Sequence, residues 1–560
     1  MAQKGLNIYI GATSLRSCLG NKAQTVAAMH RGESGLRYSD AFSMHVGSAE
    51  VALIDGYTRF ESLLIGEIAE VLSQSALSLT EGDVQLVIST TKGNVELLAE
   101  DCEEVADGAF LYASAEKIAS YFGAVKAPIV VSNACISGLS ALVVAKQQIA
   151  SGKCRHAVVV GGDVLSQFIT SGFASFKSIS AKPCRPYDAE RDGLTLGEAA
   201  GAVVLTSDVK LADEMQVRVA GGAISNDANH ISGPSRTGDG LYYAIRNAMA
   251  EAGVKSEEIG FVNTHGTATR FNDEMESKAV AWAELCNTPL NSLKGYIGHT
   301  LGASGIVEAI LCIEQLREGR IFGTAGFVSS DTPHELQLSA LEQPIAKRCC
   351  VKTASGFGGC NAAIVLDAEK REVSTEVSPR KAVKVAEYAL PKSGEPFAEF
   401  IRAEFKTFGE SNMKFYKMSD MSKGLYVAVE HLLANGGFDN VEPTRRAIIL
   451  ANRASSLDAD VVHQQILNQH NPEGASPAAF VYTLANVAAG EMCIRHKIQG
   501  ENTFFIEHEE SGFVEHYAEE LIERDCADAT SALGAVLEHE IELVGFLAPL
   551  GVIHPAIVAP

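Results

Sequence analysis

Short apolar runs alternate with longer helix-like stretches along most of the chain, and glycine-rich turns separate them. The run Ile129–Val131 breaks into small residues before a helix-like stretch at Leu139–Ala150. The runs Phe261–Val262 and Ala362–Leu366 are strand-like, and Ile306–Leu316 is helix-like. Short β-branched runs between turns favour strands, and longer periodic stretches favour helices. The alternation predicts an α/β fold with stacked, mixed sheets under layers of helices.

Composition narrows the class of protein. The net charge of -23 argues against a nucleic-acid partner. No apolar run approaches ~18 residues and no charged-then-apolar leader precedes Asn7–Ile10, so we expect neither a membrane span nor a signal peptide. The twelve cysteines show no Cys-x-x-Cys or metal-ligand spacing. We therefore expect reduced thiols, no metal site and a cytoplasmic protein.

One cysteine stands at a turn between a strand-like run and a helix-like stretch. It is Cys135, in the segment Val131-Ser-Asn-Ala-Cys-Ile-Ser-Gly138. A thiol at a helix N-terminus faces unpaired N–H groups and the positive end of the helix dipole, which favour the thiolate. Cys135 is therefore a candidate nucleophile, and the alternative is a small buried apolar side chain.

Two histidines occupy similar strand-to-loop junctions further along. His265 lies in Asn263–Thr269, and His299 lies in Lys294–Gly305 before the helix-like stretch. One reactive cysteine with two histidines is the composition of a nucleophilic acyl-transfer site. The glycine-rich segment Ser355–Asn361 adds a loop with few side chains, against which a thioester could lie closely.

With these four motifs the chain resembles the elongating β-ketoacyl-ACP synthases, which carry a Cys-His-His triad and belong to the thiolase superfamily. Arg185–Asp188 and Gly197–Gly201 are supporting matches, and the resemblance covers residues 5 to 367 in family order. Thiolases proper have one histidine with a second cysteine, and initiating synthases have histidine with asparagine, so His265 and His299 together argue against both classes. The resemblance implies a thiolase-like, layered α-β-α-β-α fold with two mixed five-stranded sheets, and halves at about 1–210 and 211–367.

The resemblance also implies a reaction and its partners. Cys135 would take an acyl group from an acyl-ACP, with the backbone N–H groups of Cys135 and Phe357 holding the oxyanion. His265 and His299 would donate hydrogen bonds to the thioester of malonyl-ACP, whose decarboxylation gives an enolate that attacks the acyl group. The product would be a 3-oxoacyl-ACP. No cofactor is implied beyond the phosphopantetheine of the acyl carrier protein.

Further site residues follow from the same resemblance. Lys294 would keep the imidazoles neutral while pairing with Glu308, and the alternative is a structural ion pair. Thr267 and Thr269 match contacts to the phosphopantetheine arm, although turn-forming hydroxyls would look the same.

Two segments match the family's mobile loops around the acyl pocket. Phe357 matches a gatekeeper phenylalanine, followed by Gly358. Ser225–His230 matches a second loop, which makes Asp227 and His230 candidates for substrate binding and not for catalysis. The gate segment lacks a further aromatic and a threonine common in the family, which leaves the acyl-chain preference open.

The segment Leu86–Asn94 narrows the subfamily. Its Lys92 and two threonines resemble the ketosynthases of aryl-polyene and flexirubin-type pigment clusters, whereas a surface turn with a solvated lysine is the alternative. A housekeeping fatty-acid synthase and a noncatalytic chain-length-factor-type partner remain the rival functions.

The chain continues well beyond the resemblance. Its 560 residues exceed the ~250–300 at which a single core stops growing. Residues 368–385 are polar and predict a linker between a unit at 1–367 and a second at 386–560. The second unit resembles only the N-terminal half of a ketosynthase, with Glu509 at the nucleophile position, like a truncated chain-length factor.

In this superfamily the nucleophile-bearing half forms the dimer interface. We therefore predict that residues 386–560 pack there, on their own chain or on a neighbouring one, and help to close the acyl tunnel. The assembly would be a homodimer or a pairing of the chain-length-factor kind. The alternatives for this unit are an inert remnant of duplication and an artificial fusion.

Overall fold

The first sheet places β7 (Ile129–Val131), the strand that leads to Cys135, at its edge. The computed structural model describes residues 3–4, 6–99, 105–369, 376–377, 380–391, 393–409, 411–434, 438–470, 474–508, 511–536 and 540–547. In spatial order, the strands of the first sheet are β2 (Tyr9–Ser17), β10 (Ala199–Thr206), β8 (His156–Asp163), β6 (Val84–Ser89) and β7 (Ile129–Val131). Every residue of β8 and β10 is buried, which explains their near-continuous apolar runs.

The second sheet repeats this arrangement. In spatial order its strands are β11 (Arg218–Asn226), β18 (Cys360–Asp367), β17 (Cys349–Gly356), β12 (Phe261–Asn263), β13 (Pro289–Asn291) and the short β15 (Gln337–Leu338). In both sheets the first two pairings are antiparallel and the next two are parallel. The two sheets touch at the pair Tyr9 and Arg218.

Helices separate and cover these sheets. α4 (Ser137–Ala150) contacts β6 and β8 on one side and β11 and β18 on the other, while α9 (Ser304–Glu318) contacts β10 and β17. Both helices are buried along almost their whole length, as a middle layer requires. α2 (Arg59–Gln74) covers the first sheet and α6 (Asp239–Ala252) the second. The predicted α/β class is confirmed, and the two predicted helices start two residues earlier than expected.

The remaining elements cover the ends and flanks of the sheets. The other helices are α1 (Lys22–His30), α3 (Leu111–Tyr121), α5 (Gln167–Ser175), α7 (Arg270–Trp282), α8 (Lys294–Ile297), α10 (Phe397–Thr407), α11 (Asp420–Leu433), α12 (Leu457–His470), α13 (Pro477–Val481), α14 (Val487–His496) and α15 (Phe513–Glu523). The short strands are β1 (Gln3–Lys4), β3 (Gly20–Asn21), β4 (Arg37–Ser39), β5 (Met44–Gly47), β9 (Leu196–Gly197), β14 (Arg320–Ile321), β16 (Gln343–Pro344) and β19 (Glu376–Val377).

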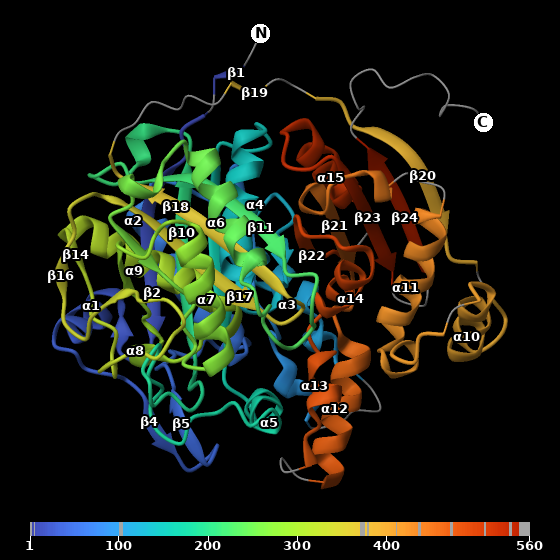
Figure 1. Cartoon of the computed structure of the whole chain (residues 1–560), viewed down its shortest axis with the longest axis horizontal. Coiled ribbons are helices and arrows are strands. Elements are labelled where there is room, and N and C mark those ends of the chain that lie inside the picture. Colours follow the sequence, from blue (N-terminus) through green and yellow to red (C-terminus); the bar gives the residue numbers. More distant parts are fainter. Residues whose placement is uncertain are drawn as a thin grey trace.

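A third sheet has the same order and sense as the first. Its strands are β20 (Val383–Ala389), β24 (Glu540–Leu547), β23 (Ala529–Val536), β21 (Arg446–Asn452) and β22 (Asn502–Ile506). With α10 to α15 they form what we call the C-terminal half-domain, drawn in orange and red in Figure 1. β22 pairs antiparallel with β7 through Phe505–Val131 and Ile506–Val130, so the third sheet continues the first.

The C-terminal half-domain therefore lies against β7, the strand just before Cys135, in its own chain. Its first strand begins at Val383, inside the segment for which a linker is expected, so the sheet starts before residue 386. The domain division itself stays a prediction. Glu509, expected at the position of the nucleophile, lies outside the described residues. In the part of the chain that the structure describes, no helix combines the length and the apolar character needed to cross a membrane.

Candidate functional site

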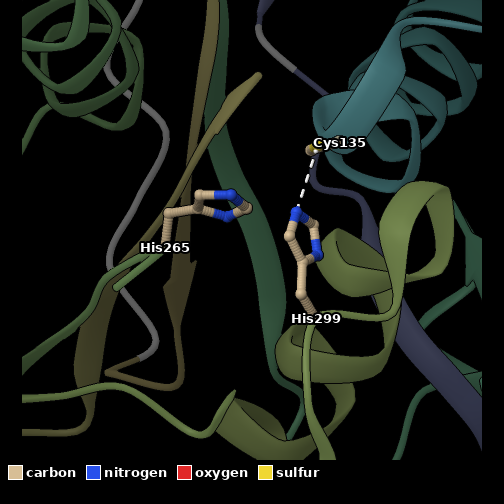
Figure 2. Close-up of side chains that lie close together, drawn as sticks. All are labelled: Cys135, His265 and His299. Atoms are coloured by element: carbon tan, nitrogen blue, oxygen red, sulfur yellow. Dashed lines mark hydrogen bonds between the residues drawn. The ribbon is translucent and has the colours of Figure 1, made fainter. Parts of the chain in front are cut away.

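Cys135 lies at the tight turn between β7 and α4. It belongs to a single 3-10 turn, η3 (Ala134–Ile136), and its side chain is buried. Ala134, just before it, has φ 45°, in the left-handed region that few non-glycine residues adopt. Strained backbone of this kind persists where the surrounding structure holds it, and it is common at functional sites. At this turn the Cys135 sulfur faces His299 (Figure 2).

The electrostatics of Cys135 differ from the expectation of a favoured thiolate. Burial raises the pKa of the thiol to about 12, although the Lys294 charge and the backbone N–H groups of Phe357 and Cys135 act in the opposite direction. The thiolate expectation is therefore wrong for the resting protein, because loss of hydration outweighs the helix end. The two N–H groups that reach the sulfur are those expected to form the oxyanion site.

His299 faces the sulfur directly. Its Nε2 lies 3.2 Å from Cys135 Sγ (Figure 2). Its Nδ1 accepts the backbone N–H of Leu301 at 3.1 Å and lies 3.0 Å from Ser304 Oγ. Since a backbone N–H can only donate, Nδ1 has no proton, and we assign the ring proton to Nε2, toward the sulfur.

His265 approaches the same space from the second sheet, where it follows β12. Its ring centroid lies 5.0 Å from that of His299, with the rings nearly perpendicular (Figure 2). Its Nδ1 lies 3.2 Å from Lys294 Nζ, a donor group, so we assign its proton to Nε2 as well. Glu276 accepts the backbone N–H groups of His265 and Gly266 and fixes the turn.

Two lysines share one carboxylate beneath the histidines. Lys294 Nζ lies 2.6 Å from Glu308 Oε1, and Lys352 Nζ lies 2.6 Å from Oε2. All three side chains are buried, so the cluster carries an excess positive charge in a medium of low polarity. Burial first, and then Lys294, lower the pKa of both His265 and His299 well below 6.5, which keeps both rings neutral. Sequence reasoning missed Lys352, although a lysine inside the apolar run of β17 was a usable signal.

The three side chains also have the composition of a metal site. Cys135 and one ring nitrogen from each histidine have their ligating atoms within 4.8 Å of one another. A metal at Nε2 needs the ring proton on Nδ1, but there both rings meet hydrogen-bond donors, Leu301 N–H and Lys294 Nζ. The hydrogen bonds around the rings therefore suit two N–H donors and do not fit a metal.

The gate loop, Ser355–Cys360, connects β17 and β18 beside the nucleophile. The Phe357 ring stacks on Phe173 at 5.9 Å and contacts Phe176 at 5.3 Å. Gly358 has φ +87°, which favours glycine there. A Cβ on Gly356 would lie 3.1 Å from the Cys135 backbone nitrogen, so the loop lies directly against the nucleophile turn.

The second loop lies beside the gate loop as expected. Asp227 N–H donates to the Gly359 carbonyl, and its buried carboxylate accepts from Ser235 N–H and Asn361 Nδ2. Burial raises the Asp227 pKa to about 7. His230 is exposed and its Nδ1 accepts backbone N–H groups within its own turn, which places it apart from the triad.

The two threonines lie between His265 and the surface. Thr267 is buried, Thr269 is half-buried, and their hydroxyl oxygens are 2.8 Å apart. They form a short polar path that ends at the start of α7.

Lys92 is buried, so the alternative of a solvated surface lysine is wrong. Its ammonium group donates to Asp460 and Ser456 of the C-terminal half-domain at 2.6 and 3.1 Å. These partners could not be predicted from the sequence, because they lie more than 360 positions away.

Comparison with known protein families gives two matches. The model described as "Beta-ketoacyl synthase, N-terminal domain" matches residues 92–210, and the one described as "Beta-ketoacyl synthase, C-terminal domain" matches residues 217–328.

Curated relatives include synthases from several organisms. The putative mitochondrial 3-oxoacyl-[acyl-carrier-protein] synthase of Schizosaccharomyces pombe is 30% identical over 256 residues, 42% of this chain and 59% of that protein. The corresponding figures for 3-oxoacyl-[acyl-carrier-protein] synthase 2 of Mycobacterium leprae are 34% over 246 residues, 41% and 58%. The chain thus spans about 58–59% of the length of these two relatives. The putative polyketide beta-ketoacyl synthase 1 of Streptomyces halstedii is 28% identical, over 56% of this chain and 83% of that protein.

Two solved structures are similar in different ways. The ketosynthase ApeO, in complex with its chain length factor ApeC from Xenorhabdus doucetiae, has 27% identity and a TM-score of 0.57 over 65% of this chain and 98% of that chain. The PfaC keto synthase–chain length factor has a TM-score of 0.78 over 98% of this chain and 79% of that chain. Its identity is 15%, so this likeness concerns the fold alone.

Proposed function

We propose that the chain is a β-ketoacyl synthase, as its matches to the N- and C-terminal domain models of that family suggest, and that it condenses a cysteine-bound acyl group with malonyl-ACP to give a 3-oxoacyl-ACP. The observation that carries the proposal is the pair of histidines whose Nδ1 atoms both meet donors. Each ring then presents an Nε2 proton to the space in front of Cys135. Two neutral N–H donors suit a developing enolate oxygen, and a cysteine–histidine hydrolase would need an acceptor there.

The first step is transfer of the acyl group to Cys135. The sulfur attacks the acyl-ACP thioester carbonyl, the bond to the phosphopantetheine sulfur breaks, and the thiol proton goes to that leaving sulfur. The Cys135 and Phe357 N–H groups, already directed at the sulfur, would hold the tetrahedral oxyanion. Because the resting thiol is protonated, proton loss must accompany attack.

The second step uses the histidines. Malonyl-ACP loses carbon dioxide, and the electron pair of the broken carbon–carbon bond forms an enolate whose oxygen accepts the two Nε2 protons as hydrogen bonds. The enolate carbon attacks the acyl group, and Cys135 leaves as a thiolate that takes up a proton. Burial, together with the charges of Lys294 and Lys352, lowers the pKa of both histidines and keeps the rings neutral, so that they act as donors without being acids. Thr267 and Thr269 would contact the phosphopantetheine arm.

The nucleophile assignment has a direct test. The Cys135→Ala chain, incubated with acyl-ACP, should show no covalent acyl adduct by intact-protein mass spectrometry. Cys526→Ala, which removes an exposed cysteine, is the matched control and should be acylated like the parent. An acyl adduct on the Cys135→Ala chain would show that the nucleophile lies elsewhere.

For the pathway, we propose elongation of polyene or related polyketide chains. The support is the resemblance of the Lys92 segment to pigment-type ketosynthases and the 27% identity to ApeO. The alternative is housekeeping fatty-acid elongation, favoured by the synthase 2 relatives. Mass spectrometry of acyl groups trapped on Cys135 decides between them, since preferential loading of conjugated unsaturated chains supports the first and of saturated chains the second.

For the C-terminal half-domain, we propose a chain-length-factor-like role within one polypeptide. Phe480 of α13 contacts Phe173 and Phe176, the two rings that contact the gate residue Phe357. A Cβ on Gly172 would lie 2.2 Å from the Phe480 ring, so α13 closes tightly on α5. The three rings lie against the gate residue, and we propose that an acyl chain on Cys135 extends toward them.

Deletion of residues 382–560 tests this role against an inert remnant or an artificial fusion. The role predicts altered product length or loss of solubility, because the edge of β7 would be exposed. Unchanged product length and solubility would contradict this role. Since β22 already pairs with β7, we propose pairing within the chain in place of a homodimer at this edge.

A further inference from the structure

The gate loop is held from outside the catalytic unit. Asn486, immediately before α14 in the C-terminal half-domain, donates its side-chain Nδ2–H to the Phe357 carbonyl at 2.8 Å. The Asn486 side chain is 1% exposed, so this hydrogen bond lies out of water. The second donor near this carbonyl is the thiol of Cys360 at 3.2 Å, a much weaker donor than an amide.

Close backbone packing joins the loop to α14. A Cβ on Gly490 would lie 2.6 Å from the Gly358 oxygen and 2.8 Å from its Cα, and a Cβ on Gly358 would lie 2.6 Å from Asn486 Nδ2. Two glycines thus allow the helix and the loop to touch. On the far side, Gly358 N–H donates to the Ile231 carbonyl, so the loop is held from both directions.

The nucleophile turn is anchored on the same half-domain. Asn133, two residues before Cys135, accepts Phe504 N–H at 2.9 Å and donates to the Asn502 carbonyl at 2.8 Å. Its side chain thereby extends the pairing of β22 with β7 toward the nucleophile. Both N–H groups that reach the Cys135 sulfur therefore belong to segments that the C-terminal half-domain holds.

We propose that Asn486 is a positioning residue of the oxyanion site, which the C-terminal half-domain thereby completes. Its amide fixes the Phe357 carbonyl, and with it the dihedral angles that direct the Phe357 N–H at the sulfur. Preorganised donors stabilise an oxyanion only when they are held in place before charge develops. The inference rests on the proposed condensation and gives the C-terminal half-domain a part in acyl transfer, beyond any effect on product length.

Asn486→Asp tests the inference, because a carboxylate keeps the shape but loses the N–H and repels the carbonyl. The matched control is Asn468→Asp on an exposed face of α12. Two rates are measured: single-turnover acylation of Cys135 by the acyl-ACP that the parent accepts fastest, and carbon dioxide release from malonyl-ACP in a Cys135→Ala background. Acylation uses the Phe357 N–H, whereas decarboxylation uses the histidines.

We expect acylation to fall on the order of 10- to 100-fold, less than the ~10²–10³ lost with a whole oxyanion donor. The ratio of acylation to decarboxylation falls at least tenfold, and the control leaves it unchanged. If Asn486→Asp melts early, Gly490→Ala displaces the Gly358 backbone and should lower the same ratio. If the parent is active and Asn486→Asp leaves the ratio of acylation to decarboxylation unchanged, this inference alone is overturned. The same holds if both rates fall by the same factor. A parent without acylation overturns the proposed function and the inference with it.

Discussion

Lys92, in the loop after β6, and Asp460, in α12 of the C-terminal half-domain, form a buried ion pair. Their charged atoms are 2.6 Å apart, and the two side chains are 3% and 7% exposed. The Thr483 carbonyl and Ser456 hydroxyl complete the ammonium's hydrogen bonds. On the other side, Asp163 accepts the N–H groups of Thr91 and Gly302, which links this pair to the loop that carries His299.

Removing one partner of that ion pair should lower the free energy of unfolding more than removing both. Asp460→Leu leaves a buried ammonium unpaired, and we expect a loss of about 3–5 kcal/mol in the free energy of unfolding. Lys92→Met with Asp460→Leu removes both charges and should recover most of that loss. Urea unfolding of the three chains measures it. Glu33→Ala, at the exposed Arg31 pair, should change nothing measurable. A double variant as unstable as the single would show that packing, not charge, holds the halves.

Condensation should keep its rate well into the acid range. Because burial and Lys294 lower the pKa of His265 and His299, both rings stay neutral as pH falls through 6.5. Lys352→Met removes one of the charges that lower these pKa values, so the acid limb of the pH–rate profile should move upward while the plateau changes less. Lys294→Met also removes the donor to His265 Nδ1 and should lower the plateau. Identical profiles for the two variants would contradict the assigned roles.

The same two histidines should make the fold sensitive to acid. Their pKa is lower in the folded chain than in the unfolded chain, so below about pH 6.5 the unfolded chain binds more protons. The free energy of unfolding should be unaffected by these groups above that pH and should fall as pH drops below it. Denaturant unfolding at pH 7.5 and pH 5.5 tests the slope. His299→Gln should reduce it, and His334→Gln, on an exposed loop, should not.

Phe480→Ala should change product length. The substitution removes the ring that packs on Phe168, Phe173 and Phe176, at a cost of about 3–5 kcal/mol. The space next to the gate should admit longer acyl chains, which mass spectrometry of the products measures. Phe415→Ala is the control, since this ring stacks on Phe405 and should lose comparable stability with no change in product length.

The motifs predicted the residues that the structure brings together, namely Cys135, His265, His299 and the Lys294–Glu308 pair, because each lies in a short motif whose spacing survives without the fold. They failed on properties that depend on distant partners. The direction of the Cys135 pKa was wrong, because burial is a property of the packed chain and outweighs the local helix end. Lys352 and Asn486 were missed, since their partners lie in other elements.

The third sheet could likewise be predicted only in part. Its likeness to the first could be predicted from the resemblance of residues 386–560 to the N-terminal half of a ketosynthase. The sequence did not show whether this sheet packs on its own chain or on a neighbouring one, because that depends on contacts between β22 and β7. In the structure, β22 lies against β7 of the same chain.

Because β22 and β7 belong to one chain, their effective concentration with respect to each other does not fall when the protein is diluted. Two separate subunits would dissociate as their concentration falls toward the dissociation constant. Here each chain carries its own β22, so every Cys135 has one such strand beside it. Turnover per molecule should therefore be the same at nanomolar and micromolar enzyme.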